Sequence, residues 1–124
     1  MVGDAVAQER AVARLSCRPE AGPGRVLCEL EVEVGSKTQL TWADGLVVQS
    51  PEFAPPLRSR VGISQASTKT PTRVRLPIAL GATGSGQGTL EVVARWVICT
   101  QGDDCHSGTS STQAAVRVGS VAEP

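Results

Sequence analysis

The stretch Val26-Leu27-Cys28-Glu29-Leu30-Glu31-Val32-Glu33-Val34 shows the clearest pattern in this 124-residue chain. From residue 26 onward every second side chain is apolar, and positions 29, 31 and 33 are glutamates. Because successive side chains of a strand point to opposite faces, this pattern predicts a strand with one buried and one solvated face. Similar patterns predict further strands at 11–17, 38–48, 74–80, 89–99 and 114–118, with an interruption at Ala43-Asp44-Gly45.

Turn signals separate these segments at intervals of roughly ten residues, as in two-layered all-β domains. The chain is therefore predicted to be all-β, an immunoglobulin-like β-sandwich of about seven short antiparallel strands. We expect residues 1–10 to be a flexible lead-in, 11–119 to form the domain, and 120–124 to be a disordered tail. The residues predicted to be buried together are Val26, Leu30, Val32, Leu90, Val92 and Trp96. Pro77 lacks a backbone donor, which predicts an edge strand, a bulge or a donor position that faces outward.

The composition narrows the range of functions. Twelve basic and twelve acidic residues give a formal net charge of zero, which argues against nucleic acid as a partner. The aromatic residues are Trp42, Phe53 and Trp96, too few for a base-stacking platform. Both tryptophans are expected in the core, whereas Phe53 is expected either in the core or in a cap or partner contact. No apolar run is long enough for membrane insertion, and no motif calls for a cofactor.

The four cysteines indicate an oxidising compartment, so we expect a periplasmic or otherwise extracytoplasmic domain. The first residues have no secretory signal pattern, and we expect a signal or anchor to be absent from this sequence. Four cysteines allow three pairings, and the spacing favours Cys17 with Cys28 and Cys99 with Cys105. Cys17 and Cys28 flank a Pro- and Gly-rich turn and share the apolar side of their strands, which predicts a structural disulfide.

Cys99 and Cys105 lie at the boundary between an apolar strand and a polar loop, where a disulfide could be either a staple or a redox-active bond. Other chemistry is less well supported. His106 is the only histidine, and no strained turn for a nucleophilic serine is present. Zinc requires three or four soft ligands, and no metal site is predicted.

Four short motifs in order resemble the N-terminal periplasmic domain of the thiol:disulfide interchange protein DsbD. They are Trp42-Ala43-Asp44-Gly45, Glu52-Phe53, Leu76-Pro77-Ile78 and the Cys-x5-Cys pair of residues 99 and 105. The resemblance covers a little over half of the chain. That family usually has an aromatic residue and prolines after its second cysteine, where this chain has His106-Ser107-Gly108.

The resemblance implies an immunoglobulin-like thiol-disulfide interchange module with Cys99 and Cys105 as its catalytic pair. Cys105 would form mixed disulfides with a thioredoxin-fold partner, and Cys99 would resolve them. Phe53 would shield the pair, with Glu52 as a supporting residue. From the residues alone, His106 would lower the pKa of the adjacent Cys105 thiol when protonated, while Asp103 and Asp104 would raise that pKa, and the sequence leaves the net direction open. The alternative is a non-catalytic immunoglobulin-like domain of an envelope protein, binding or structural, with two structural disulfides.

Overall fold

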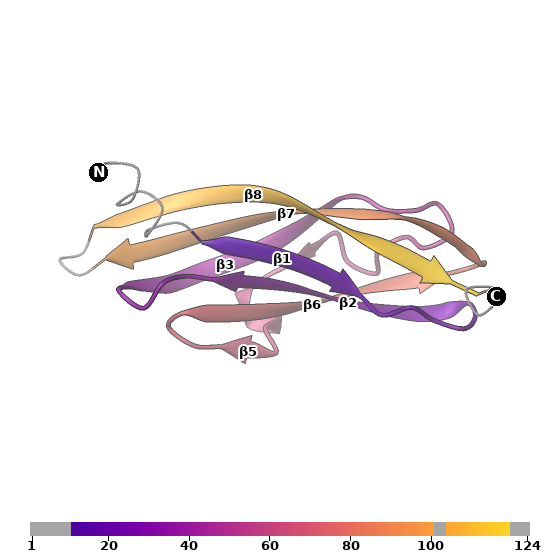
Figure 1. The fold of residues 1–124 in the computed structure, drawn as a ribbon, viewed down its shortest axis with the longest axis horizontal. Coiled ribbons are helices and arrows are strands. Elements are labelled where there is room, and N and C mark those ends of the chain that lie inside the picture. Colours follow the sequence, from indigo (N-terminus) through magenta and orange to yellow (C-terminus); the bar gives the residue numbers. More distant parts are fainter. Residues whose placement is uncertain (1–10, 101–103, 120–124) are drawn as a thin grey trace.

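The computed structural model describes residues 11–100 and 104–119, and within them it contains eight strands and one short 3-10 helix (Figure 1). The expected lead-in at 1–10 and the expected tail at 120–124 lie outside the described residues. The elements in chain order are β1 (Val12–Cys17), β2 (Gly24–Glu33), β3 (Thr38–Gln49), β4 (Arg60–Val61), η1 (Ile63–Gln65), β5 (Thr68–Lys69), β6 (Arg73–Ala82), β7 (Gly86–Thr100) and β8 (Cys105–Val118).

The strands form two antiparallel sheets, each of four strands. One sheet has the order β1-β2-β6-β5 and the other has the order β4-β3-β7-β8. These orders correspond to the two sheets of an immunoglobulin domain, with one short strand added beside β3. The predicted fold class is therefore confirmed, and the chain is an all-β immunoglobulin-like sandwich.

The inner faces of the two sheets form one aliphatic core. The six residues predicted to be buried together all lie in this core. Trp96 has less than a tenth of its surface exposed and is the only aromatic residue among the buried core residues that the structure describes. The largest fully buried apolar side chains come from β2, β6, β7 and β8, and include Leu30, Leu76, Ile78, Leu80 and Leu90. Period-two alternation thus identified the central strands correctly, because their inner faces must be apolar to pack together.

Three predictions about individual segments were wrong. β3 runs through the supposed interruption at 43–45, with register shifts on either side of it. The last strand is 14 residues long rather than five, because its first half is rich in serine and threonine and has no apolar alternation. Trp42 is partly exposed, since the shift between Leu40 and Trp42 turns its side chain to the outer face, where Arg95 lies 5.7 Å from its ring centroid.

Pro77 is tolerated inside a strand because of the direction in which its backbone points. It lies in the middle of β6, opposite Glu29 of β2. The carbonyl of Arg75 accepts from Ser67, and that of Ala79 accepts from Leu57, so alternate residues of β6 turn their backbone groups away from β2. Pro77 shares this orientation, and its missing donor faces outward, as one of the sequence-based alternatives stated.

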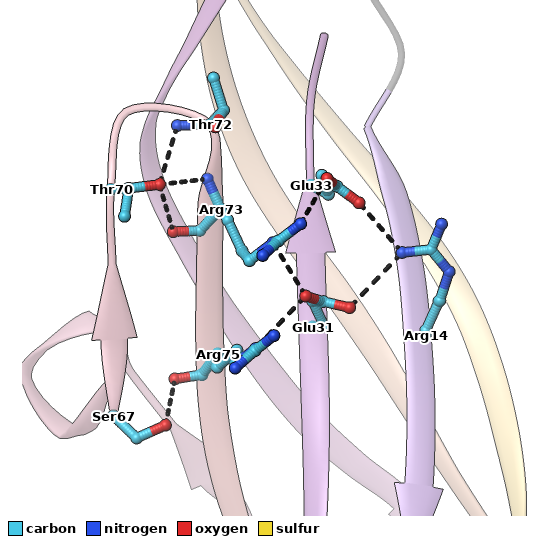
Figure 2. Close-up of polar contacts among 8 residues, drawn as sticks. All are labelled: Arg14, Glu31, Glu33, Ser67, Thr70, Thr72, Arg73 and Arg75. Carbon is cyan, nitrogen blue, oxygen red and sulfur yellow. Dashed lines mark hydrogen bonds and ion pairs between the residues drawn. The ribbon is translucent and has the colours of Figure 1, made fainter. Parts of the chain in front are cut away.

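Ion pairs cross the outer face of the first sheet (Figure 2). Arg14 of β1 contacts Glu31 and Glu33 of β2, and Arg73 of β6 contacts the same two carboxylates, at distances of 2.8–3.4 Å. Arg75 adds a further contact to Glu31 at 3.3 Å. The hydrogen bonds of Arg73 and Arg14 hold the pKa of Glu33 below its ordinary value. The glutamates that marked the solvated face therefore bridge three neighbouring strands.

Gly108 is required where β8 crosses the indole of Trp96. The two residues are direct cross-strand partners, and a Cβ on Gly108 would lie 2.6 Å from Cε2 and 2.8 Å from Cζ2 of that ring. We predict that Gly108→Ala lowers the free energy of unfolding by about 1–3 kcal/mol, because the buried ring has little room to move. Urea denaturation followed by tryptophan fluorescence measures this loss.

Gly22→Ala is the matched control, since a Cβ there meets nothing within 4 Å. It should leave stability unchanged or raise it slightly, by reducing the entropy of the unfolded chain. Equal stability losses in the two variants would contradict the assigned contact between Gly108 and Trp96.

Candidate functional site

The Cys99–Cys105 disulfide joins the end of β7 to the beginning of β8. The two residues are direct cross-strand partners, and their Cα atoms are 4.0 Å apart. The N–H of Thr100 donates to the carbonyl of Asp104 at 2.8 Å, so the neighbouring pair is hydrogen-bonded. Pairs alternate along an antiparallel ladder, which makes the cysteines a non-hydrogen-bonded pair, the kind whose Cα atoms approach most closely. The bond therefore closes a hairpin that the backbone already forms.

The two cysteines of this bond differ in exposure. Cys99 is partly buried on the outer face of the second sheet, and Cys105 is exposed. The Thr41 hydroxyl donates to the carbonyl of Val97 at 3.1 Å, and its oxygen lies 4.0 Å from the Cys99 sulfur. Thr41 reaches this position because it lies between the two residues of β3 where the register shifts. In the described part of the chain, it is the only side chain that makes a polar contact with either sulfur.

His106 follows Cys105 along β8 but belongs to the other face. It is the cross-strand partner of Ile98, whose side chain is in the core, and it is itself exposed. Since consecutive residues of a strand point to opposite faces, the imidazole is directed away from the face that carries the disulfide. Sequence proximity to Cys105 therefore does not make His106 a neighbour of the sulfur.

Phe53 lies at the opposite end of β7 from the cysteines. A Cβ built on Gly86 or Gly88 would lie 3.0–3.6 Å from its ring, which places the ring over the first residues of that strand. Cys99 follows 13 residues after Gly86, a separation on the order of 40 Å along an extended strand. The structure thus does not bring Phe53, or the adjacent exposed Glu52, to the disulfide. The expectation that Phe53 shields the cysteine pair was wrong.

The second disulfide confirms the predicted pairing of Cys17 with Cys28. These residues are direct cross-strand partners on β1 and β2, and their Cα atoms are also 4.0 Å apart. The N–H of Arg18 donates to the carbonyl of Leu27 at 3.0 Å, so again the adjacent pair is the hydrogen-bonded one. Cys28 is buried and Cys17 partly buried, whereas Cys105 of the other bond is exposed.

Asp44 forms a buried ionic centre on the same outer face as Cys99. Its side chain has no exposed surface, and Arg95 of β7 donates to both of its oxygens at 2.9 and 2.5 Å. Arg60 of β4 donates to it from the other side at 2.8 Å. Burial opposes ionisation most strongly, but the hydrogen bonds and charges of Arg95 and Arg60 together outweigh it and hold the pKa of Asp44 below its ordinary value.

Sequence reasoning missed this centre, although it quoted Asp44 within a motif. An aspartate inside an otherwise apolar strand is the available signal, because a buried carboxylate requires partners. The identity of those partners depends on cross-strand neighbours 16 and 51 residues away, which no local pattern reveals.

Across residues 11–100 and 104–119, no three histidine, cysteine, aspartate or glutamate side chains gather as a metal would require. The same ranges hold no helix with the length and apolar character needed to cross a membrane.

No protein-family model and no curated protein matches this chain. Solved structures with a similar arrangement include murine CRIg, with 12% identity, a TM-score of 0.46, and coverage of 88% of this chain and 98% of that one. The collagen-binding subdomain of the Enterococcus faecalis surface protein ACE has 10% identity, a TM-score of 0.42, and coverage of 82% and 94%. A PapD-like domain of human CEP192 has 11% identity, a TM-score of 0.43, and coverage of 90% and 86%.

We predict that Asp44 makes stability depend on acid pH. Its folded pKa lies below the unfolded value of about 3.9, so its contribution is present above that value and is lost as the pH falls through the folded pKa. Asp44→Asn should lower the free energy of unfolding at pH 7 by about 1–2 kcal/mol, less than for a fully buried pair because both arginines are about half exposed. Urea denaturation at pH 7 and at pH 3 measures both effects.

Glu52→Gln makes the same chemical change at an exposed loop position and serves as the control. The difference between Asp44→Asn and the unaltered chain should shrink at pH 3. A difference that stays constant from pH 7 to pH 3 would show that the Asp44 charge does not stabilise the fold.

Proposed function

We propose that this chain is a non-catalytic immunoglobulin-like domain in which both disulfides are structural. The observation that carries the proposal is the repeated placement of the two bonds. Each joins directly opposed residues of adjacent strands, next to a hydrogen-bonded pair at the end of a hairpin. Cysteines at such positions form a disulfide without any displacement of the backbone, so the bonds add covalent strength to an existing ladder.

The surroundings of Cys99 and Cys105 support this proposal. A reactive cysteine needs a positive or strongly polar environment that stabilises its thiolate. Here the imidazole of His106 belongs to the other face, and Phe53 packs at the far end of β7. The contact that remains is the neutral hydroxyl of Thr41 at 4.0 Å. None of these features favours the thiolate of either cysteine.

The proposed setting is an oxidising compartment outside the cytoplasm, where structural disulfides persist. In that setting the domain would bind a protein partner or act as a structural unit of an envelope protein. Its balanced charge and its outer faces, on which arginine side chains are paired with carboxylates, suit contact with another protein better than contact with nucleic acid.

Thiol-disulfide interchange of the DsbD type is the second candidate, and the exposure of Cys105 is the observation that favours it. A thiolate of a thioredoxin-fold partner would attack the Cys105 sulfur, form a mixed disulfide and release Cys99 as a thiolate. The second thiol of the partner would then attack the mixed disulfide. The products would be reduced Cys99 and Cys105 and an oxidised partner.

The reduction potentials of the two bonds test the proposal. We predict that both lie below about −300 mV, as structural disulfides do, with Cys99–Cys105 the easier to reduce because Cys105 is exposed. Equilibration with thioredoxin or glutathione buffers, followed by alkylation and mass spectrometry, gives each potential. Peptide mapping assigns each value to its bond.

A Cys99→Ser variant provides the complementary test with a thioredoxin-fold protein that keeps one active-site cysteine, held as a disulfide with a small thiol, so that attack by the Cys105 thiolate would release the small thiol and leave a mixed disulfide. We predict no stable mixed disulfide through Cys105. A Cys99–Cys105 potential near that of thioredoxin, together with such a trapped species, would replace the structural role with thiol interchange.

Removal of each bond should destabilise the domain without unfolding it. In the chain-entropy model, loss of the Cys99–Cys105 bond costs about 2 kcal/mol and loss of the Cys17–Cys28 bond about 3 kcal/mol, since the second closes the longer loop. We predict cooperative unfolding for both double Cys→Ala variants, measured by circular dichroism in urea. An unfolded Cys99→Ala/Cys105→Ala variant would contradict a hairpin held mainly by its backbone ladder.

A further inference from the structure

β8 is by far the longest edge strand of the sandwich. It has 14 residues, whereas the other three edge positions are taken by β1 with six residues and by β4 and β5 with two each. Figure 1 shows β8 running along one rim of the molecule for most of its length. An edge strand presents unpaired backbone groups, so its length decides how much of the sheet remains open to another chain.

The sequence of β8 contains none of the usual devices that protect an edge. It pairs with β7 over 14 consecutive positions with no bulge, and it contains no proline. Between His106 and Arg117 every side chain is uncharged. Natural edge strands are commonly interrupted by charges, prolines or bulges that prevent pairing with other chains. Their absence from so long a strand indicates an edge that is kept available for pairing.

The register with β7 shows which backbone groups are available. Since Cys99 and Cys105 form a non-hydrogen-bonded pair, every second residue of β8 from Cys105 onward turns both its N–H and its C=O away from β7. Arg117 confirms this orientation, because its carbonyl accepts from Glu20 at 3.1 Å on that side. Within the described part of the chain, Glu20 is the only backbone partner on this side of β8. The remaining outward positions are Cys105, Ser107, Thr109, Ser111, Gln113 and Ala115.

The first two thirds of β8 are the part of this edge that is more available for pairing with another chain. Near the C-terminal end, Ala114, Ala115 and Arg117 line a groove of about 310 Å³ shared with β1, and Glu20 bridges to β8 there. Residues 105–113 precede that groove. They offer outward backbone groups at regular two-residue intervals, next to exposed side chains such as Ser107 and Thr109.

We propose that residues 105–113 of β8 pair with the same residues of a second copy of this chain, antiparallel and centred on Thr109. In this register Ser107 of each copy lies opposite Ser111 of the other, so the outward N–H and C=O groups face each other. The pairing joins two four-stranded sheets into one continuous sheet of eight strands. It goes beyond the proposed function by naming a partner and a mode of assembly.

Self-pairing fits the chemistry of this segment better than pairing with a charged segment does. Symmetry places Thr109 opposite its own counterpart, so a charge at the centre of the strand would meet a like charge. Here the central positions hold serine, threonine, glycine and glutamine, and opposed serine and threonine side chains can hydrogen-bond across strands. The Cys99–Cys105 bond fixes the first residue of the strand to β7, so the edge is held in register up to its beginning.

Sedimentation equilibrium of the oxidised full chain, from about 10 µM to 1 mM, tests the proposal. Because one strand pair is a small interface, we expect a monomer–dimer equilibrium within this range. Ser107→Pro removes one outward N–H from each copy without removing a bond to β7, and should weaken dimerisation about tenfold or more. Ser107→Ala keeps the N–H and is the matched control, which should dimerise as the unaltered chain does.

Thr109→Lys is the second variant, which keeps the test valid if the proline variant does not fold. It places two ammonium groups next to each other at the centre of the dimer and should abolish dimerisation at low salt, with partial recovery at 1 M salt. Circular dichroism and thermal unfolding verify the fold of each variant. A chain that is monomeric at 1 mM, or a folded Ser107→Pro variant that dimerises normally, would overturn the proposal. These measurements do not involve thiol exchange, so the proposed function can fail or succeed separately.

Discussion

The packing of β2 and β6 against β3 and β7 is the constraint on which the rest of the structure depends. The core is built almost entirely from valine, leucine, isoleucine and alanine, so the sheets must approach closely to fill it. Gly45 shows how close this approach is, since a Cβ at that position would lie 2.8 Å from a methyl group of Leu30 in the facing sheet. Small aliphatic side chains leave little room for polar groups inside: among the described residues, Thr38 and Asp44 are the buried polar or charged ones, and Asp44 lies on an outer face.

The outer faces use their charges to connect strands. On the first sheet, glutamates of β2 bridge arginines of β1 and β6. On the second, Asp44 connects β3 to β7 and to β4, a strand of only two residues that could not be held by its ladder alone. The two groups of ion pairs differ in how strongly their charges interact. The exposed pairs are screened by water, whereas Asp44 is fully enclosed and its charge must be compensated by Arg60 and Arg95.

Sequence reasoning succeeded where local pattern and burial coincide. The alternation of β2 and β7 identified both strands and their buried faces, because central strands of a sandwich carry the strictest requirement. It failed for the first half of β8, where a polar edge strand needs only to pair with β7 and carries no pattern of its own. It also failed for Trp42, since the register shift at Thr41 reverses the face and leaves no local mark. The partners of Asp44 and the position of Phe53 depend on contacts between distant segments, which single-sequence patterns do not contain.

The two cysteine pairs show why a correct pairing does not by itself establish a function. Both pairs lie at non-hydrogen-bonded positions beside the last hydrogen bond of a hairpin, and this geometry alone is sufficient for a disulfide. The spacing of the cysteines predicted the Cys99–Cys105 bond, whereas the resemblance carried by short motifs implied a Phe53 cap, and the fold places Phe53 on the order of 40 Å away. Redox function depends on the groups around a sulfur rather than on the spacing of two cysteines. Among the described residues, the neutral Thr41 hydroxyl is the polar side-chain group in contact with either sulfur, and this contact supports the proposed structural bond more than the motif supports a redox bond.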